Sequence, residues 1–209
     1  MRKFCLTIIV LAGFSKALFA QFGNCTASEM QTYTDRETGN TITILTDTLK
    51  NDRFLYQTDP MWTHDGKYLL FRSSSRANDK KIERTLPNGE KRSWTPTQIY
   101  FIEMATGQII QATEGPDLGS AFLANKSNRM FISRKEKEDW NLYVMNLDKF
   151  FADVKKGKVG KPAVYETLLG TFPTNMGRPG GYAIDCNDDY AYITVEREGT
   201  EEEKERMAK

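Results

Sequence analysis

Three stretches with one shared pattern decide the fold: "WTHDGKYLLF" (62–71), "LANKSNRMFIS" (123–133) and "DCNDDYAYITV" (185–195). Each contains a polar turn rich in Asp, Asn, Gly or Ser, residues that favour tight turns. Each then runs into alternating apolar residues, whose side chains point to the two faces of a strand. The recurrence of this turn and strand predicts a repeated β unit.

The repeat has a regular length, because Phe71, Ile132 and Ile193 follow one another at intervals of 61 residues. Repeats of this kind are typical of β-propellers, in which each repeat forms one blade of antiparallel strands. Only closure into a ring removes the sheet edges, and the chain has room for about three blades. We therefore predict an all-β fold, with residues 21–209 forming a partial β-propeller that is the N-terminal part of a longer domain.

Residues 1–20, "MRKFCLTIIVLAGFSKALFA", differ from the rest of the chain. Arg2 and Lys3 precede a short apolar run, and Ala20 ends a small-residue cleavage site. This pattern predicts a secretory signal peptide, and its apolar run is too short for a membrane span. We therefore expect export to the periplasm or the extracellular space.

The charge excludes one class of partner. The formal net charge is +1, and removing the signal peptide with Arg2, Lys3 and Lys16 leaves −2 (1 − 3). A near-neutral protein has no global field to attract nucleic acid or an anionic membrane. Local arginines and lysines must therefore hold any anionic ligand.

Residues that commonly perform chemistry are few. Cys25 and Cys186 remain after cleavage and could pair or stay free, but two thiols are too few for a zinc cluster. His64 is the single histidine; it could be a base or a metal ligand, but its place in the turn "THDGK" favours a structural role. We predict no metal site within this chain and leave the catalytic residues unassigned.

Arginines are the better candidates for ligand binding. Arg53 and Arg72 flank the first repeated strand, and Arg178 lies in the glycine-rich stretch 170–181. A guanidinium binds a carboxylate through two parallel hydrogen bonds, so three arginines at one face of a propeller could bind a uronate sugar. The alternative is that each arginine is an ordinary surface charge.

Segments between the repeats carry further expectations. Residues 72–96 are rich in Lys and Arg and form a long loop or a small extra hairpin, which is either solvated or a basic wall for an acidic ligand. The rings of Phe54, Tyr56 and Trp62 are expected to pack between blades. The stretch "FFADVKKGKVGK" (150–161) is expected to form one helical turn.

Three stretches resemble the N-terminal half of the oligogalacturonate lyases: "LTDTLKNDRFLYQTDPMWTHDGKYLLFRSSS" (45–75), "TQIYFIEMATGQIIQATEG" (97–115) and "NLYVMNLD" (141–148). In that family, too, a polar and aromatic segment precedes a "DGK-LLF" strand. A "LTEG"-like step follows the next hairpin, and its counterpart here is "ATEG" (112–115). The resemblance covers residues 41–150.

The resemblance implies a seven-bladed propeller that cleaves short pectin fragments by β-elimination. This reaction neutralises a galacturonate carboxylate and removes the proton at C5. The family uses a divalent metal, expected to be manganese, held mainly by histidines and a glutamine of later blades, and none of these ligands carries over to this chain. "DRFLYQ" matches a cleft-lining segment, which implies that Arg53, Tyr56 and Gln57 contact an acidic oligosaccharide.

Three functions remain open from the sequence. The first is an exported oligogalacturonate-lyase-like protein whose N-terminal part is inactive by itself. The second is a non-catalytic secreted propeller that binds a glycan or a cell-envelope partner. The third is the propeller of a serine peptidase. A histidine-rich metal segment, a serine nucleophile elbow, or neither, in the sequence after Lys209 would distinguish them.

Overall fold

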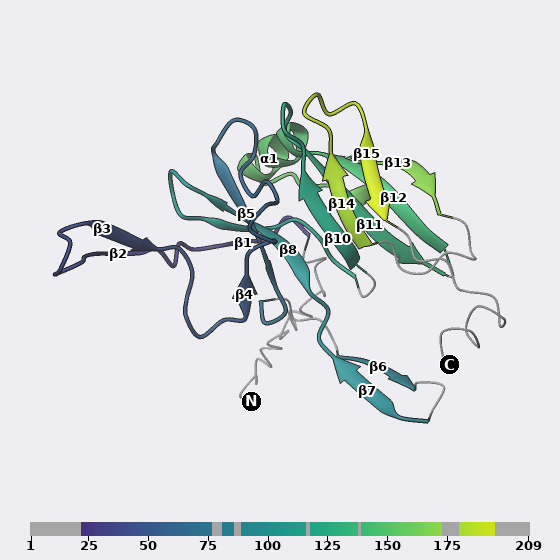
Figure 1. Ribbon diagram of the computed structural model, residues 1–209, viewed down its shortest axis with the longest axis horizontal. Helices are drawn as coiled ribbons and strands as arrows, with labels where there is room; N and C mark the ends of the chain where they lie inside the picture. Colours follow the sequence, from purple (N-terminus) through teal and green to yellow (C-terminus); the bar gives the residue numbers. More distant parts are fainter. Residues whose placement is uncertain are drawn as a thin grey trace, which may run out of the picture.

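The computed structural model describes residues 22–76, 81–85, 89–115, 118–137, 139–172 and 180–194. Antiparallel strands make up most of this part of the chain (Figure 1). The all-β prediction is therefore confirmed for the described residues, while the number of blades stays a prediction. The predicted signal peptide lies outside them.

The first sheet has five strands in the spatial order β1-β9-β8-β5-β4. All of its pairings are antiparallel. Its strands are β1 (Cys25–Thr26), β4 (Asp52–Arg53), β5 (Tyr68–Ser73), β8 (Gln98–Glu103) and β9 (Ile109–Gln111). The four strands β4, β5, β8 and β9 follow one another in chain order, apart from an inserted hairpin, and β1 adds an outer edge.

The second sheet is antiparallel and follows chain order, with β10 (Leu118–Leu123), β11 (Arg129–Glu136), β12 (Asp139–Asn146) and β13 (Glu166–Thr171). A separate antiparallel hairpin comes next, formed by β14 (Gly180–Ile184) and β15 (Ala191–Thr194). Strand β14 lies beside β10 (Figure 1). The strands that begin the second sheet and the hairpin therefore lie next to one another.

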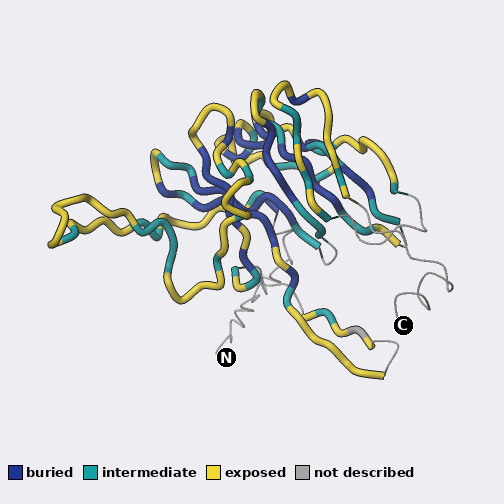
Figure 2. Tube along the Cα trace, in the orientation of Figure 1, coloured by how far each residue is buried: buried dark blue, intermediate teal, exposed yellow. Residues whose placement is uncertain are grey.

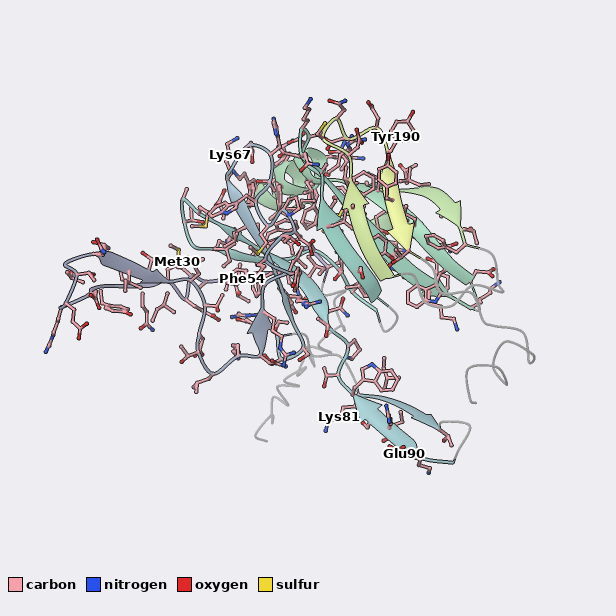
Figure 3. All side chains as sticks on the ribbon, viewed as in Figure 1. Met30, Phe54, Lys67, Lys81, Glu90 and Tyr190 are labelled. Atoms are coloured by element: carbon pink, nitrogen blue, oxygen red, sulfur yellow. The ribbon has the colours of Figure 1, made fainter. Side chains whose placement is uncertain are left out.

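Two further hairpins project from this body (Figures 1 and 2): β2 (Gln31–Thr34) with β3 (Thr41–Ile44), and β6 (Ile82–Thr85) with β7 (Lys91–Trp94). The second hairpin shows that the 72–96 insertion is an extra hairpin rather than a loop. Figure 3 places Lys81 and Glu90 on this hairpin, well away from the sheets.

The 61-residue repeat is present in the backbone. In each of the three turns a backbone N–H donates a hydrogen bond to the carbonyl oxygen five residues later, and the N···O distance is 3.0 Å in all three. The pairs are Thr63 to Tyr68, Ala124 to Arg129, and Asp185 to Tyr190. These pairs are spaced by 61 residues. The turn and strand pattern read from the sequence is therefore a structural repeat.

The main core lies between the first two sheets. One face of each sheet contributes buried apolar side chains, and α1 (Leu147–Lys155) inserts Leu147, Phe150 and Phe151 between them. Phe151 stacks on Tyr68 at 3.6 Å between ring centroids and meets the edge of Phe101 at 5.1 Å. This core buries apolar surface from elements far apart in sequence, which is the main favourable term in folding.

Two sequence expectations were wrong here. The stretch after Asn146 forms a nine-residue helix rather than one turn, since the Asn146 side chain caps it by accepting a hydrogen bond from the Lys149 amide at 2.9 Å. The rings of Phe54, Tyr56 and Trp62 are 47%, 67% and 47% exposed instead of packing between sheets. The phenylalanines of α1 occupy that place.

Three smaller points complete the fold. A short 3-10 helix, η1 (Pro162–Val164), leads into β13. Cys25 and Cys186 are both exposed and free, so the pairing that the sequence left open is not formed. Among the described residues, no helix has the length and apolar character that crossing a membrane requires.

Candidate functional site

Strands β4, β10 and β14 each depart from regular strand pairing, and these irregularities lie along the cleft described below. Strand β4 pairs with β5 only through Asp52 and Arg53, and the pairing resumes at the bridge between Trp62 and Leu69. Residues 54–60 loop out between them, and Pro60 has no amide hydrogen to donate to a ladder. Leu55 of this segment packs against the main core, while Tyr56 and Asp59 line the cleft described below.

Strands β10 and β14 are irregular along the same cleft. The register of β10 against β11 shifts between Leu118 and Ala121, where a side chain on Gly119 would collide with the Ser133 hydroxyl and the Trp140 ring. The register of β14 shifts between Gly180 and Tyr182. Bulges of this kind are found next to active sites, where they redirect side chains.

A cleft of about 1120 Å³ opens along these three irregular strands. Five aromatic residues line it, from the loop after β4, the end of β7, and strands β10, β12 and β14: Tyr56, Trp94, Phe122, Trp140 and Tyr182. Aromatic faces are suited to packing against the apolar face of a sugar ring. The size and lining suit an oligosaccharide better than an isolated ion.

The charged groups of the cleft are mostly cationic. Among its described lining residues, Arg53, Arg72 and Lys135 are basic and Asp59 is acidic. Arg53 and Arg72 face each other across β4 and β5 as directly opposed residues. Their side chains therefore leave the same face of the sheet, where like charges at this spacing repel.

Neither of the two arginines has a counter-ion in the described part of the chain. Every ion pair found there involves other residues. A guanidinium group offers a fork of hydrogen-bond donors that matches a carboxylate or another planar anion. This arginine pair is the most specific chemical feature of the cleft.

A second arginine cluster lies on the opposite face of β4. Arg76 donates two hydrogen bonds to Asp52 (2.8 and 2.6 Å) and two to Glu29 (2.9 and 2.6 Å). Its side chain is only 6% exposed and lies over the Phe71 ring, 5.3 Å from the centroid. Burial lowers the pKa of Arg76, but the two carboxylates raise it to a larger extent, and Arg76 lowers the pKa of Glu29.

The structure brings together three of the five residues predicted to contact a ligand. Arg53, Tyr56 and Arg72 line the cleft. Gln57 is exposed and is not among the lining residues, because residues 56–59 form a turn that carries its side chain elsewhere. Arg178 lies outside the described residues. The expectation of an anionic-ligand site thus rests on the arginine pair.

Sequence reasoning missed several lining residues. Trp94, Lys135 and Trp140 come from β7, β11 and β12, which are far from the "DRFLYQ" segment in sequence. A signal was present for Trp140, since it stands at the start of an alternating strand directly after a polar turn. Asp59 could have been found as the acid of the same polar and aromatic segment.

His64 has a structural environment. Its Nδ1 lies 2.9 Å from the carbonyl oxygen of Asn125 in the next turn. Because a carbonyl only accepts, Nδ1 carries the hydrogen. The Asp65 amide also donates to the Asn128 side chain at 3.3 Å. The preference for a turn role over a catalytic one therefore agrees with these contacts.

The third turn is tied to the second by a carboxylate. Asp188 accepts hydrogen bonds from the amides of Asn125 (2.6 Å) and Lys126 (2.8 Å) and from the Ser127 hydroxyl (3.0 Å). Its side chain is 2% exposed, with Arg129 at 3.7 Å. Burial raises the pKa of Asp188, but these hydrogen bonds lower it overall. Figure 3 shows Lys67 and Tyr190, which mark the first and third turns, at the same end of the molecule.

The described residues do not fit a divalent metal ion. No group of three His, Cys, Asp or Glu side chains among them is arranged to hold one. The described lining of the cleft contains one carboxylate, Asp59, and no histidine or cysteine. A manganese ion would need more oxygen or nitrogen ligands than this.

Comparisons with known proteins agree with this architecture. No known family profile matches the chain, and no curated protein does. A solved structure of an oligogalacturonate lyase in complex with manganese is similar, with a TM-score of 0.54 and 19% identity, over 80% of this chain and 36% of that chain. An oligogalacturonate lyase from Vibrio parahaemolyticus is also similar, with a TM-score of 0.53 and 20% identity, over 79% of this chain and 35% of that one.

The chain therefore spans about a third of the length of these structures. Their manganese belongs to the neighbour's printed description and not to this chain. At this level of identity the likeness is one of fold. The described part of this chain has the fold of about a third of an oligogalacturonate lyase.

Proposed function

We propose that this chain supplies part of the substrate-binding wall of an exported, oligogalacturonate-lyase-like protein. In this proposal the two sheets and the β14–β15 hairpin are the first blades of a seven-bladed propeller. The three strands that begin them surround its axis, and the cleft along these strands binds a short, acidic oligosaccharide. Residues 1–20 direct the chain out of the cytoplasm.

One observation carries the proposal: the cleft combines aromatic side chains with an arginine pair that has no counter-ion among the described residues. A galacturonate unit offers a sugar ring and a carboxylate, and both features meet that chemistry. Arg53 and Arg72 would bind the carboxylate, and Tyr56 and Trp140 would pack against the rings. A guanidinium on the carboxylate also stabilises the charge that develops when the C5 proton leaves.

The reaction itself needs more than this wall. β-Elimination requires a base near C5, and in the resembling family it requires a divalent cation that polarises the carboxylate when bound. No group of three His, Cys, Asp or Glu side chains among the described residues is arranged to hold such a cation. We therefore propose that this chain contributes substrate binding. The catalytic groups would belong to a longer protein, in the region that corresponds to the unmatched two thirds of the similar structures.

The test compares binding and turnover. The chain should bind unesterified oligogalacturonate in calorimetry without generating the unsaturated uronate that absorbs in the ultraviolet. A longer protein that contains the chain should generate that product, and a chelator should suppress it. Binding without product from the longer protein would favour the non-catalytic glycan-binding alternative. Absence of binding in both would contradict the proposal.

A further inference from the structure

Strand β4 carries Arg53, one half of the arginine pair, but it is only two residues long. It consists of Asp52 and Arg53, which pair with Ser73 and Arg72 at the edge of the first sheet. On its other side the chain leaves into the exposed loop 54–60. Two residues of ladder are a weak attachment, because strands gain stability from several neighbouring pairs.

Asn51 donates hydrogen bonds to Ser74 and Ser75, and Arg76 supplies a further, charged attachment. Successive side chains of a strand point to opposite faces, so Arg53 faces the cleft while Asp52 faces away from it. On that opposite face the Asp52 side chain, which is 9% exposed, accepts two hydrogen bonds from Arg76. They come from Nε at 2.8 Å and from Nη2 at 2.6 Å. A buried, bidentate arginine–carboxylate contact fixes geometry as well as adding energy.

We infer that Arg76 is a positioning residue for the anion site, acting through Asp52 to hold Arg53 opposite Arg72. Arg76 itself does not line the cleft. This inference rests on the proposed function, since it concerns how the same cleft recognises a uronate carboxylate. The expected consequence is ligand selectivity: the cleft selects free carboxylates because the two guanidinium groups are kept at a fixed separation.

The second fork of Arg76 provides an internal comparison. Glu29 receives two hydrogen bonds of equivalent length, but it belongs to the segment before β2 and not to β4. A merely stabilising role for Arg76 predicts similar effects when either carboxylate is changed. A positioning role predicts that only Asp52 matters for ligand selection.

The experiment uses the full chain with Asp52→Asn and Glu29→Gln, and Arg92→Gln as a surface control outside the cleft. Affinity is measured by calorimetry for unesterified and for methyl-esterified trigalacturonate. Asp52→Asn should lower the preference for the unesterified form about tenfold, the value of one charge-assisted hydrogen bond. Glu29→Gln and Arg92→Gln should change it by no more than about twofold.

Hydrogen exchange of the amides in β4 and β5 gives a readout that needs no ligand. Asp52→Asn should speed exchange in β4 more than Glu29→Gln does. Equal effects of the two variants on exchange and on selection would overturn the inference. If the wild-type chain binds no oligogalacturonate, the proposed function fails, while faster β4 exchange in Asp52→Asn alone would still support the positioning role and equal exchange would contradict it.

Discussion

The two interfaces between neighbouring sheets of this molecule, here called seams, are stabilised by different interactions. The first seam, between the first and second sheets, is filled by an apolar core into which α1 inserts Phe150 and Phe151. The second seam, between the second sheet and the β14–β15 hairpin, has a smaller cluster around Phe122 and Phe131, with Tyr182 packed against it. There the buried carboxylate of Asp188 binds the neighbouring turn.

The difference shows what each repeat gains from its neighbours. A complete sheet with a covering helix buries a large apolar area at its seam, and the hydrogen bonds from His64 and Asp65 to the next turn add to that burial. A two-stranded hairpin buries little, and such hairpins are marginal in isolation. Its attachment therefore depends on hydrogen bonds between turns, which are directional and sensitive to single substitutions.

The largest expected effect is on the first seam. Phe150→Ala removes a fully buried ring that meets Phe22 at 5.0 Å and Tyr165 at 5.5 Å between centroids. Cavity formation should lower the free energy of unfolding by about 3–5 kcal/mol. Denaturant titration followed by circular dichroism measures this. A loss no larger than that of an exposed-residue control such as Leu49→Ala would contradict the importance of this core.

A smaller effect is expected at the second seam. Asp188→Ala leaves the amides of Asn125 and Lys126 without their acceptor, at a total cost of about 1–3 kcal/mol, because these residues lie in an exposed turn where water can replace the carboxylate in part. Asp188 has φ 64°, a region that Asn tolerates better than Ala. Asp188→Asn should therefore lose less, and the exposed Asp189→Ala should lose little. Hydrogen exchange localised to β14 and β15 would report the change, and uniform exchange across all sheets would contradict it.

Acid should weaken the turn contacts next. Burial raises the pKa of Asp65, but hydrogen bonds from Lys67 and Thr63 lower it from 3.8 to about 2, and the pKa of Asp188 is also lowered. Because the folded-state values lie below the unfolded ones, the stability they contribute is present above pH 3.8 and lost as the pH falls toward about 2. Unfolding curves across this window should show the fall. In Asp188→Asn the fall should be shallower, and an unchanged slope would argue against the carboxylate.

The smallest effect concerns the thiols. Cys186 lies in the third turn and Cys25 in β1, and both are free. Reduction should therefore leave the thermal midpoint unchanged, since neither of the two described cysteines forms a disulfide. A thiol titration and a thermal scan with and without reductant measure this. A lower midpoint on reduction would reveal a disulfide and contradict the free state.

Much of the fold could be predicted from the turn and strand pattern, because turn residues and alternation are local signals. The three hydrogen bonds that begin at Thr63, Ala124 and Asp185 reproduce the 61-residue spacing. The length of the helix after Asn146 was underestimated, because lysines follow its apolar residues closely in the sequence and obscure the apolar stripe of Phe150, Phe151 and Val154. Its stability comes from tertiary packing, which local sequence does not display.

The candidate site was predictable only in part. Arg53 and Arg72 were recognisable from their positions beside one strand, and their opposition follows from the β4–β5 register. The register shift near Gly119 and the approach of Trp140 depend on pairing between distant segments. The role of Arg76 was hidden because its partners Glu29 and Asp52 lie 47 and 24 residues away.

The most direct test of the central claim is the affinity of the full chain for unesterified trigalacturonate, measured by calorimetry for wild type and for Arg53→Gln/Arg72→Gln. The arginine pair should account for most of the binding, so the double variant should bind at least about a hundredfold more weakly, with an unchanged unfolding curve. Lys135, which also lines the cleft, should not replace it. Equal affinity of wild type and double variant would contradict the claim that the arginine pair recognises an acidic sugar.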